Sequence, residues 1–315
     1  MSRRVFVLLT ILSSGLFLRP GYSDDYHLQP KEIAQDTYVL QGADEDFSFQ
    51  NGGNILNTGF IVTSQGVLVI DTGPSRLYGE QLRKAIDGIT DKKILRVYNT
   101  HLHPDHFLGN QAFADVPIAA LLGTIAGMRQ QGDMFTDNMY RLVDHWMTGT
   151  YPVLPTEEIQ PGTMDIGEHR LSFIELQGHT QADLAIYDHT TGVLFAGDLV
   201  FHNRAPTTPH ADLKKWTDSL KRLEALAFRI VVPGHGPIAD GTAPILQTGD
   251  YLRWLGSSLR EQADTGKDMV EVLYAKIPSE FSTLAVMPQE YQRSVSHFYP
   301  KLERQALQPA AQRNR

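Results

Sequence analysis

Three histidines and an aspartate stand close together in the segment His101-Leu102-His103-Pro104-Asp105-His106. In an extended or loop segment, alternate residues point the same way, so His101 and His103 can grip one ion together. Asp105 and His106 follow and can point toward a second ion. Imidazole and carboxylate donors suit Zn, and also Fe or Mn. The segment therefore predicts a metal centre, with a run of surface histidines as the alternative.

Further candidate ligands lie downstream, each beside a glycine and next to a short apolar run. They are His179 in Gly178-His179-Thr180, Asp198 in Ala196-Gly197-Asp198, and His235 in Pro233-Gly234-His235. The apolar runs are typical of β-strands, and loops at strand ends converge at one edge of a sheet. We therefore expect these three residues to meet the histidine cluster in the folded chain.

The number of candidate ligands favours two metal ions. Five histidines and two aspartates make seven ligands. A catalytic zinc normally takes three or four protein ligands and leaves a position for water, so seven fit two ions if one carboxylate bridges them. The chain has no cysteine, which excludes thiolate ligands and a small fold held together by disulfides.

Strands and helices must bring these residues together. Short apolar runs bounded by turn residues predict strands over 36–40, 59–62, 67–70, 94–98, 170–176, 184–187, 193–196 and 230–232. Apolar stripes at helical spacing predict helices over 82–89 and 213–227, a helical insert over 124–150 and a helical part over 244–315. The order favours an α/β fold with two β-containing halves and helices outside. Periodicity alone does not choose between a sheet-on-sheet sandwich and a doubly wound sheet.

The N-terminus has the parts of an export signal. Arg3 and Arg4 are followed by an apolar stretch over 5–18, and Gly21-Tyr22-Ser23 offers small residues for cleavage after Ser23. The apolar stretch is shorter than the roughly 18–20 residues of a spanning helix, which makes an uncleaved membrane anchor the less favoured alternative. We expect a periplasmic or secreted protein with no stable membrane span after cleavage.

The composition is that of a globular protein without a nucleic-acid surface. Hydrophobic residues make up 42% of the chain and charged residues 20%, which allows a sizeable core. The net charge is −8, whereas nucleic-acid binding needs a basic patch. We therefore expect no nucleic-acid partner. The expected partner is a small-molecule substrate.

The motifs H-x-H-x-D-H, G-H-T, G-D and G-H-G, in this order, resemble the metallo-β-lactamase superfamily over nearly the whole chain after residue 23. The resemblance implies an αββα sandwich, here with a helical insert and a helical C-terminal extension. It also implies one metal on His101, His103 and His179, a second on Asp105, His106 and His235, and Asp198 as the bridge. Asp71, in a D-T-G sequence at a predicted strand end, matches an aspartate that orients ligands without binding metal.

A finer resemblance is to the quinoprotein relay system zinc metallohydrolases. It is carried by residues 99–106, 109–113, 178–184, 195–201 and 290–295. It implies export and a functional link to a dehydrogenase that depends on pyrroloquinoline quinone (PQQ), but it does not imply a substrate. We expect residues 1–23 to be a signal peptide and 24–315 to form one metallo-β-lactamase-fold hydrolase domain.

Residues and resemblance together lead us to expect a dinuclear zinc hydrolase. Two zinc ions lower the pKa of a shared water toward about 7, which makes hydroxide available as the nucleophile. Asp105 and Asp198 are the expected catalytic residues. Asp198 as a bridge favours thioester, ester, lactone or phosphoester substrates, and the lack of cysteine excludes the cysteine-ligated β-lactamases. Competing interpretations are a β-lactam-hydrolysing enzyme, a quinone-cofactor carrier with structural metal, and a mononuclear iron oxygenase.

Two groups of residues are candidates for the substrate pocket. His202 and Arg204 follow Asp198 closely and are candidates to line it, since loops after strands often carry specificity, with a role outside the pocket as the alternative. The insert around 128–140 is either one wall or an ordinary packed helix pair. The remaining histidines are expected to be surface or structural residues: His27, His145, His169, His189, His210 and His297.

Overall fold

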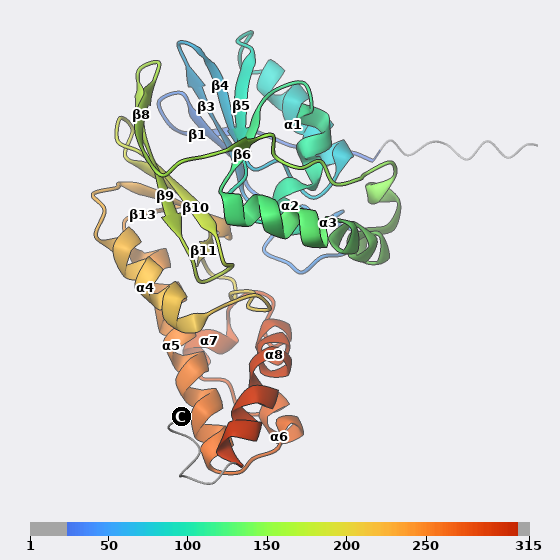
Figure 1. Cartoon of the computed structure of the whole chain (residues 1–315), viewed down its shortest axis with the longest axis vertical. Helices are drawn as coiled ribbons and strands as arrows, with labels where there is room; N and C mark the ends of the chain where they lie inside the picture. Colours follow the sequence, from blue (N-terminus) through green and yellow to red (C-terminus); the bar gives the residue numbers. More distant parts are fainter. Residues whose placement is uncertain (1–23, 308–315) are drawn as a thin grey trace, which may run out of the picture.

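Two β-sheets pack face to face and carry helices on their outer faces (Figure 1). The computed structural model describes residues 24–307, so the predicted signal peptide lies outside the described residues. The first sheet has its strands in chain order, antiparallel from β1 to β4 and parallel from β4 to β7. These strands are β1 (Lys31–Ala34), β2 (Thr37–Leu40), β3 (Thr58–Thr63), β4 (Gly66–Ile70), β5 (Ile94–Tyr98), β6 (Ile118–Ala120) and β7 (Glu157–Glu158).

The second sheet has the order β13-β12-β11-β10-β9-β8, and only its β11–β12 pair is parallel within residues 24–307. Its strands are β8 (Gly162–Ile166), β9 (His169–Leu176), β10 (Asp183–Asp188), β11 (Val193–Phe201), β12 (Ile230–His235) and β13 (Ala239–Asp240). All eight predicted strands are present at their predicted places. The additional strands are all short. β6 lies between β5 and β7, and the others are edge pieces such as β8, whose residues are mostly exposed and carry no apolar run.

The sandwich core lies between the two sheets. Ile61, Leu68 and Tyr98 of the first sheet share one buried cluster with Phe173 and Phe195 of the second. The rings of Tyr98 and Phe173 lie 4.8 Å apart between centroids. Because each strand alternates its side chains between two faces, the opposite faces must be covered by helices.

Helices cover both outer faces, which confirms the αββα sandwich and rules out a doubly wound single sheet. α1 (Arg76–Asp87) packs Leu82 and Ile86 against the first sheet. α4 (Leu213–Glu224) and α5 (Ala243–Asp264) pack against the second, with Trp216 and Leu252 fully buried. The helical C-terminal part continues through α6 (Met269–Leu273), α7 (Ser279–Ser282) and α8 (Gln289–Ala306).

The predicted insert is a long helix with a short turn after it. It comprises α3 (Leu122–Val143) and η2 (Asp144–Met147), which share a buried cluster with α2 (Pro104–Phe107) and η1 (Leu108–Phe113). The insert therefore packs directly on the segment that carries the histidine cluster. Across the described residues, no helix combines the length and apolar character that crossing a membrane requires.

Candidate metal centre

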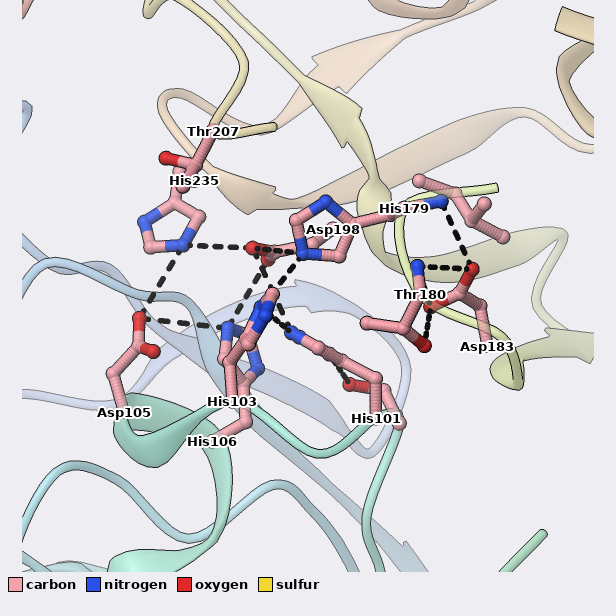
Figure 2. Close-up of polar contacts among 12 residues, drawn as sticks. His101, His103, Asp105, His106, His179, Thr180, Asp183, Asp198, Thr207 and His235 are labelled. Atoms are coloured by element: carbon pink, nitrogen blue, oxygen red, sulfur yellow. Dashed lines mark hydrogen bonds and ion pairs between the residues drawn. The ribbon is translucent and has the colours of Figure 1, made fainter. Parts of the chain in front are cut away.

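The seven predicted ligands meet at one edge of the sandwich, although they come from both sheets. His101 and His103 follow β5, and Asp105 and His106 lie in α2. Figure 2 shows these four side chains facing the three that come from the second sheet. The latter are His179 between β9 and β10, Asp198 in β11 and His235 at the end of β12. All seven are buried, with at most 9% of any residue exposed.

The first group consists of His101, His103, His179 and Asp198. Nδ1 of His103 lies 3.1 Å from Nε2 of His101 and 2.8 Å from Nε2 of His179. Oδ2 of Asp198 lies 3.3 Å from Nε2 of His179 and 3.7 Å from Nε2 of His101. Two atoms bound to one zinc at about 2.0–2.2 Å in tetrahedral directions lie about 3.3–3.6 Å apart. These spacings suit donors that share one ion.

The second group consists of Asp105, His106 and His235. Oδ2 of Asp105 lies 3.6 Å from Nε2 of His106 and 3.4 Å from Nε2 of His235. Asp198 also reaches this group, since its Oδ1 lies 3.1 Å from Nε2 of His106 and its Oδ2 lies 3.2 Å from Nε2 of His235. The Asp198 carboxylate therefore lies between two sets of imidazoles, where one carboxylate can serve two ions.

Buried charge in the site also suits cations. Asp71, Asp105 and Asp198 are each at most 4% exposed, and within residues 24–307 they form ion pairs with histidines and with no lysine or arginine. Nε2 of His106 and Oδ1 of Asp198 have no hydrogen-bond partner among the described residues. Since buried charges need compensation, two divalent ions fit this donor set.

The pKa of His106 shifts in the opposite direction from the pKa values of the three histidines in the first group. Burial lowers the pKa of His101 and His103 well below 6.5 and that of His179 to about 3. Neutral imidazole is the form that binds metal. Burial also opposes the charge of His106, but the carboxylates of Asp198, Asp105 and Asp71 outweigh it and raise the pKa of His106 well above 6.5. Three carboxylates therefore attract positive charge at His106.

Asp71 anchors the histidine segment to the end of β4 through contacts with Thr100 and His106. It follows β4 with a φ of 57°, and its backbone N–H donates to the carbonyl of Tyr98 at 2.9 Å. Its carboxylate accepts from the backbone and the hydroxyl of Thr100 at 2.8 and 2.7 Å, and its Oδ2 lies 2.7 Å from Nδ1 of His106. Asp71 thus orients His106 and lies outside both groups of candidate ligands.

An asparagine pair fixes the two ends of the same segment. The side chains of Asn99 and Asn110 exchange hydrogen bonds of 3.0 and 2.8 Å, and Thr72 donates to Asn110 at 2.9 Å. All three residues are fully buried. Their bonds close the loop that carries His101 to His106, because they join the residue after β5 to η1.

The turn that carries His179 is held by an aspartate whose role the sequence reasoning missed. Asp183 accepts hydrogen bonds from the backbone N–H groups of His179 and Thr180 and from the Thr180 hydroxyl. Gly178 has a φ of 139°, and a Cβ there would lie 2.1 Å from Cα of Trp216. The G-H-T-Q-A-D sequence is therefore a structured turn packed against α4, as its fixed spacing of Thr and Asp signals.

We expected Asp198 and His235 on loops that follow the strands over 193–196 and 230–232, but both residues lie within the strands themselves. β11 runs to Phe201 and β12 to His235, because their parallel pairing resumes beyond an irregularity at Gly197. Gly197 has a φ of 52°, which few other residues adopt readily, so it interrupts the apolar pattern before Asp198. The ring of His235 turns Nε2 toward Asp105 and Asp198, and its other nitrogen, Nδ1, donates to the carbonyl of Ile55 at 2.7 Å.

A cavity of about 390 Å³ opens onto both groups, with His103, Asp105, Asp198 and His235 in its wall. Arg204 also lines it, as we considered. His202 is not part of its wall within residues 24–307, because its Nδ1 donates to the carbonyl of Pro237 at 2.7 Å.

The insert forms one wall of the cavity and also packs as an ordinary helix. Phe135, Asn138 and Leu142 of α3 line the cavity. Met128 and Met139 are buried in the cluster beneath, whereas Met134 and Tyr140 are exposed. Only one face of α3 therefore meets the cavity.

Sequence reasoning also missed residues that the fold brings to this cavity. His210 lies with Nδ1 2.8 Å from Nε2 of His103, and Glu290 and Arg293 arrive from α8. They lie between 104 and 187 residues after His106 in the sequence, so spacing did not signal them. The segment 290–295 was noted only through the finer resemblance.

Comparison with known proteins places this site in a family. The family model of the metallo-beta-lactamase superfamily matches residues 51–235 of the chain. The acyl-coenzyme A thioesterase MBLAC2 of Gallus gallus is 28% identical over 211 residues, which cover 59% of this chain and 74% of that protein. The hydroxyacylglutathione hydrolase of Erythrobacter litoralis is 28% identical over 173 residues, which cover 54% of this chain and 59% of that protein.

A solved structure shows the same fold. A metallo-beta-lactamase from Pontibacter korlensis superposes with a TM-score of 0.59 at 22% identity, over 72% of this chain and 99% of that one. At this identity the likeness speaks for the fold alone. The family match, by contrast, spans more than half of the chain and includes all seven converging side chains. The chain therefore belongs to the metallo-beta-lactamase superfamily and is a metal-dependent hydrolase.

Proposed function

We propose that the site holds two zinc ions and hydrolyses an acyl ester, thioester or lactone. The observation that carries the proposal is the place of Asp198, whose two oxygens lie 3.1 Å from Nε2 of His106 and 3.3 Å from Nε2 of His179. His101, His103 and His179 would hold one ion, and Asp105, His106 and His235 the other. When bound, two such ions supply a water of lowered pKa and polarise the bond that it attacks.

The protein's own residues set the geometry for this chemistry. Asp198 fixes the separation of the two groups, because it contacts imidazoles of both. Asp105 lies in the cavity wall beside His235, so it is placed to orient a water or a substrate oxygen at the edge of the site. Asp105 and Asp198 are thus the carboxylates that would lie beside the reacting atoms.

The cavity favours an acyl substrate. Apolar side chains of Phe47, Phe135 and Leu142 line it beside the two groups, which suits a hydrocarbon or aromatic acyl part. Two relatives are named as hydrolases of acyl-coenzyme A and of hydroxyacylglutathione, which are both thioesters. Phosphoesters and β-lactams are the substrate classes against which this proposal must be tested.

We also propose that the protein is exported and acts beside a PQQ-dependent dehydrogenase. The support is the N-terminal sequence with Arg3, Arg4 and an apolar stretch, together with the motifs over 99–113 and 290–295. Fractionation of cells that express the full chain, with N-terminal sequencing of the product, tests the export. A protein that stays in the cytoplasm with residues 1–23 attached would contradict it.

The function is tested on protein that begins at Asp24, expressed without added metal. We expect elemental analysis to find two zinc ions per chain and a panel of esters, thioesters and lactones to be turned over faster than phosphoesters and β-lactams. The Asp198→Asn variant should lose one ion and at least about 100-fold of the activity. Substitution of residues that only hydrogen-bond to metal ligands already costs about 10–100-fold in metal affinity or activity. One iron per chain would overturn the zinc proposal. Tight binding of PQQ without any turnover would instead support a carrier.

A further inference from the structure

His210 is the only hydrogen-bond partner of Nε2 of His103 among the described residues, at 2.8 Å from its own Nδ1. It is an exposed residue in the segment between β11 and α4, and it lines the cavity. The two rings are tilted by 36° with centroids 5.0 Å apart. The contact therefore links a candidate metal ligand to the cavity rim.

The geometry determines which nitrogen carries each proton. Nδ1 of His103 faces Nε2 of His101 and of His179, so Nδ1 is the atom directed at the first metal position. A neutral imidazole that ligates through Nδ1 carries its proton on Nε2. This N–H then donates to Nδ1 of His210, which must be the acceptor and carries its own proton on Nε2.

Three of the other four candidate histidines obtain their outer contacts from the buried interior, whereas Nδ1 of His179 has no hydrogen-bond partner among residues 24–307. Nδ1 of His106 lies against Asp71, and Nδ1 of His235 donates to the carbonyl of Ile55. Nδ1 of His101 lies 3.0 Å from the Thr100 hydroxyl. Only His103 among these four uses an exposed side chain, so its orientation depends on a residue at the cavity rim.

The backbone around His210 is held on both sides. The N–H of Ala211 donates to the carbonyl of Thr208 at 2.9 Å, and the N–H of Asp212 donates to the carbonyl of Gly178 at 2.8 Å. Phe135 of α3 packs edge-on against the rings of both His103 and His210, with centroids 6.1 and 6.2 Å away. His210 is thus fixed relative to the turn of His179 as well as to His103.

We propose that His210 is a positioning residue for the first metal ion: it fixes the tautomer and the ring orientation of His103. Outer partners of this kind raise the basicity of a ligand, and their loss typically weakens metal binding by about 10–100-fold. The inference rests on the proposed dinuclear site. It predicts an effect on one of the two ions and not on the other.

The test compares zinc affinities rather than activity alone. Metal-free wild-type protein, His210→Ala and His210→Asn are titrated with zinc against a chelating indicator. Asn places an acceptor oxygen near the position of Nδ1, whereas Ala removes the acceptor. His297→Ala is the matched control, because it is an exposed histidine near His210 without a contact to any candidate ligand.

We expect His210→Ala to weaken one zinc-binding step by about 10–100-fold and to leave the other within about twofold. Asn should recover most of the loss, and His297→Ala should behave as the wild type. In the cobalt-substituted protein, the visible absorption of one site should shift in His210→Ala. Unchanged affinities and spectra in His210→Ala would overturn the proposal, and so would equal weakening of both steps. A wild-type protein that binds no zinc would instead count against the proposed function.

Discussion

The carboxylate of Asp71 lies 2.7 Å from Nδ1 of His106 and accepts two further hydrogen bonds from Thr100. One fully buried side chain thus connects the end of β4 to two points of the histidine segment. Because its negative charge faces Nδ1, the proton of a neutral His106 is held there and Nε2 is left as the ligand atom.

Asp71→Asn should therefore weaken zinc binding at the second group, which contains His106, by about 10–100-fold. Its amide can present only one oxygen, so either Thr100 or His106 faces an NH₂ group, and His106 can then be held in the wrong tautomer. Zinc titration of the metal-free protein measures the effect. Asp36→Asn is the control, since Asp36 also has a positive φ, 54°, beside a strand and lies outside the candidate metal groups. Equal affinities in Asp71→Asn and wild type would contradict the assigned orientation.

Gly234→Ala should displace Asp198 from its bridging position without replacing any candidate ligand. A Cβ at this position would lie 1.9 Å from Oδ1 of Asp198 and 2.8 Å from its backbone nitrogen. Real Cβ atoms do not approach so closely, so Asp198 must move away from one of the two groups. We expect elemental analysis to find fewer than two metal ions per chain and the activity to fall at least about 100-fold, as for loss of a ligand contact.

A matched glycine change separates this effect from a general loss of stability. Gly88→Ala meets nothing closer than 3.4 Å, so it should keep its metal and its activity. Both variants should be compared by thermal unfolding of the metal-free protein. If Gly234→Ala retains two metal ions and full activity, Asp198 does not bridge at this position.

Much of the fold could be predicted because its central strands have buried, continuous apolar runs. β4 is an example, since every residue in it is buried. β8 was missed because most of its residues are exposed, and its place in the sheet depends on its pairing with β9. Such edge pairing depends on the tertiary fold, which a local pattern does not contain.

The candidate ligands could be found because they stand in short motifs, but their supports could not. Asn57 illustrates the limit: its side-chain amide donates to the carbonyls of Pro233 and Gly236, about 180 residues away in the chain. His210 and Glu290 likewise reach the cavity through the packing of α4 and α8. A lone polar residue of this kind has no spacing that signals its partner.

Glu290 is expected to be a stability determinant of the cavity wall. It is fully buried, accepts from the Thr207 hydroxyl at 2.7 Å, and lies 3.7 Å from Nη2 of Arg204, which is 2% exposed. Glu290→Ala leaves a buried guanidinium without its carboxylate, so we expect a loss of about 3–5 kcal/mol in the free energy of unfolding. Urea denaturation of the metal-free protein measures it.

Arg293 provides the comparison for Glu290. It also pairs with this carboxylate, at 2.6 Å, but its side chain is 38% exposed. Arg293→Gln should therefore cost no more than about 1 kcal/mol, because the Arg293 end of the pair is solvated and Glu290 keeps its contacts with Thr207 and Arg204. If the two variants were equally destabilised, burial of Arg204 would not be the reason for the effect of Glu290→Ala.

A second buried pair, far from the candidate ligands in the second sheet, predicts how stability depends on pH. Nδ1 of His169 lies 2.7 Å from Oδ2 of Asp188, and both residues are at most 2% exposed. Burial opposes the charge of His169, but the hydrogen bond and charge of Asp188 outweigh it and raise the pKa of His169 above 6.5. Burial likewise opposes the charge of Asp188, but hydrogen bonds from His169 and Thr191 lower the pKa of Asp188 below 3.8.

The charged pair of His169 and Asp188 therefore stabilises the fold between about pH 3.8 and the raised pKa of His169. Its contribution requires ionised Asp188, so it is complete above pH 3.8, and it requires charged His169, so it is lost as pH rises through the raised pKa of His169. His169→Asn keeps a donor near Nδ1 but carries no charge. We expect it to lower the free energy of unfolding by about 2 kcal/mol at pH 6 and by progressively less toward pH 9. Urea denaturation of both metal-free proteins at several pH values measures this difference, and a difference that stays constant over the range would show that His169 is not charged in the folded protein.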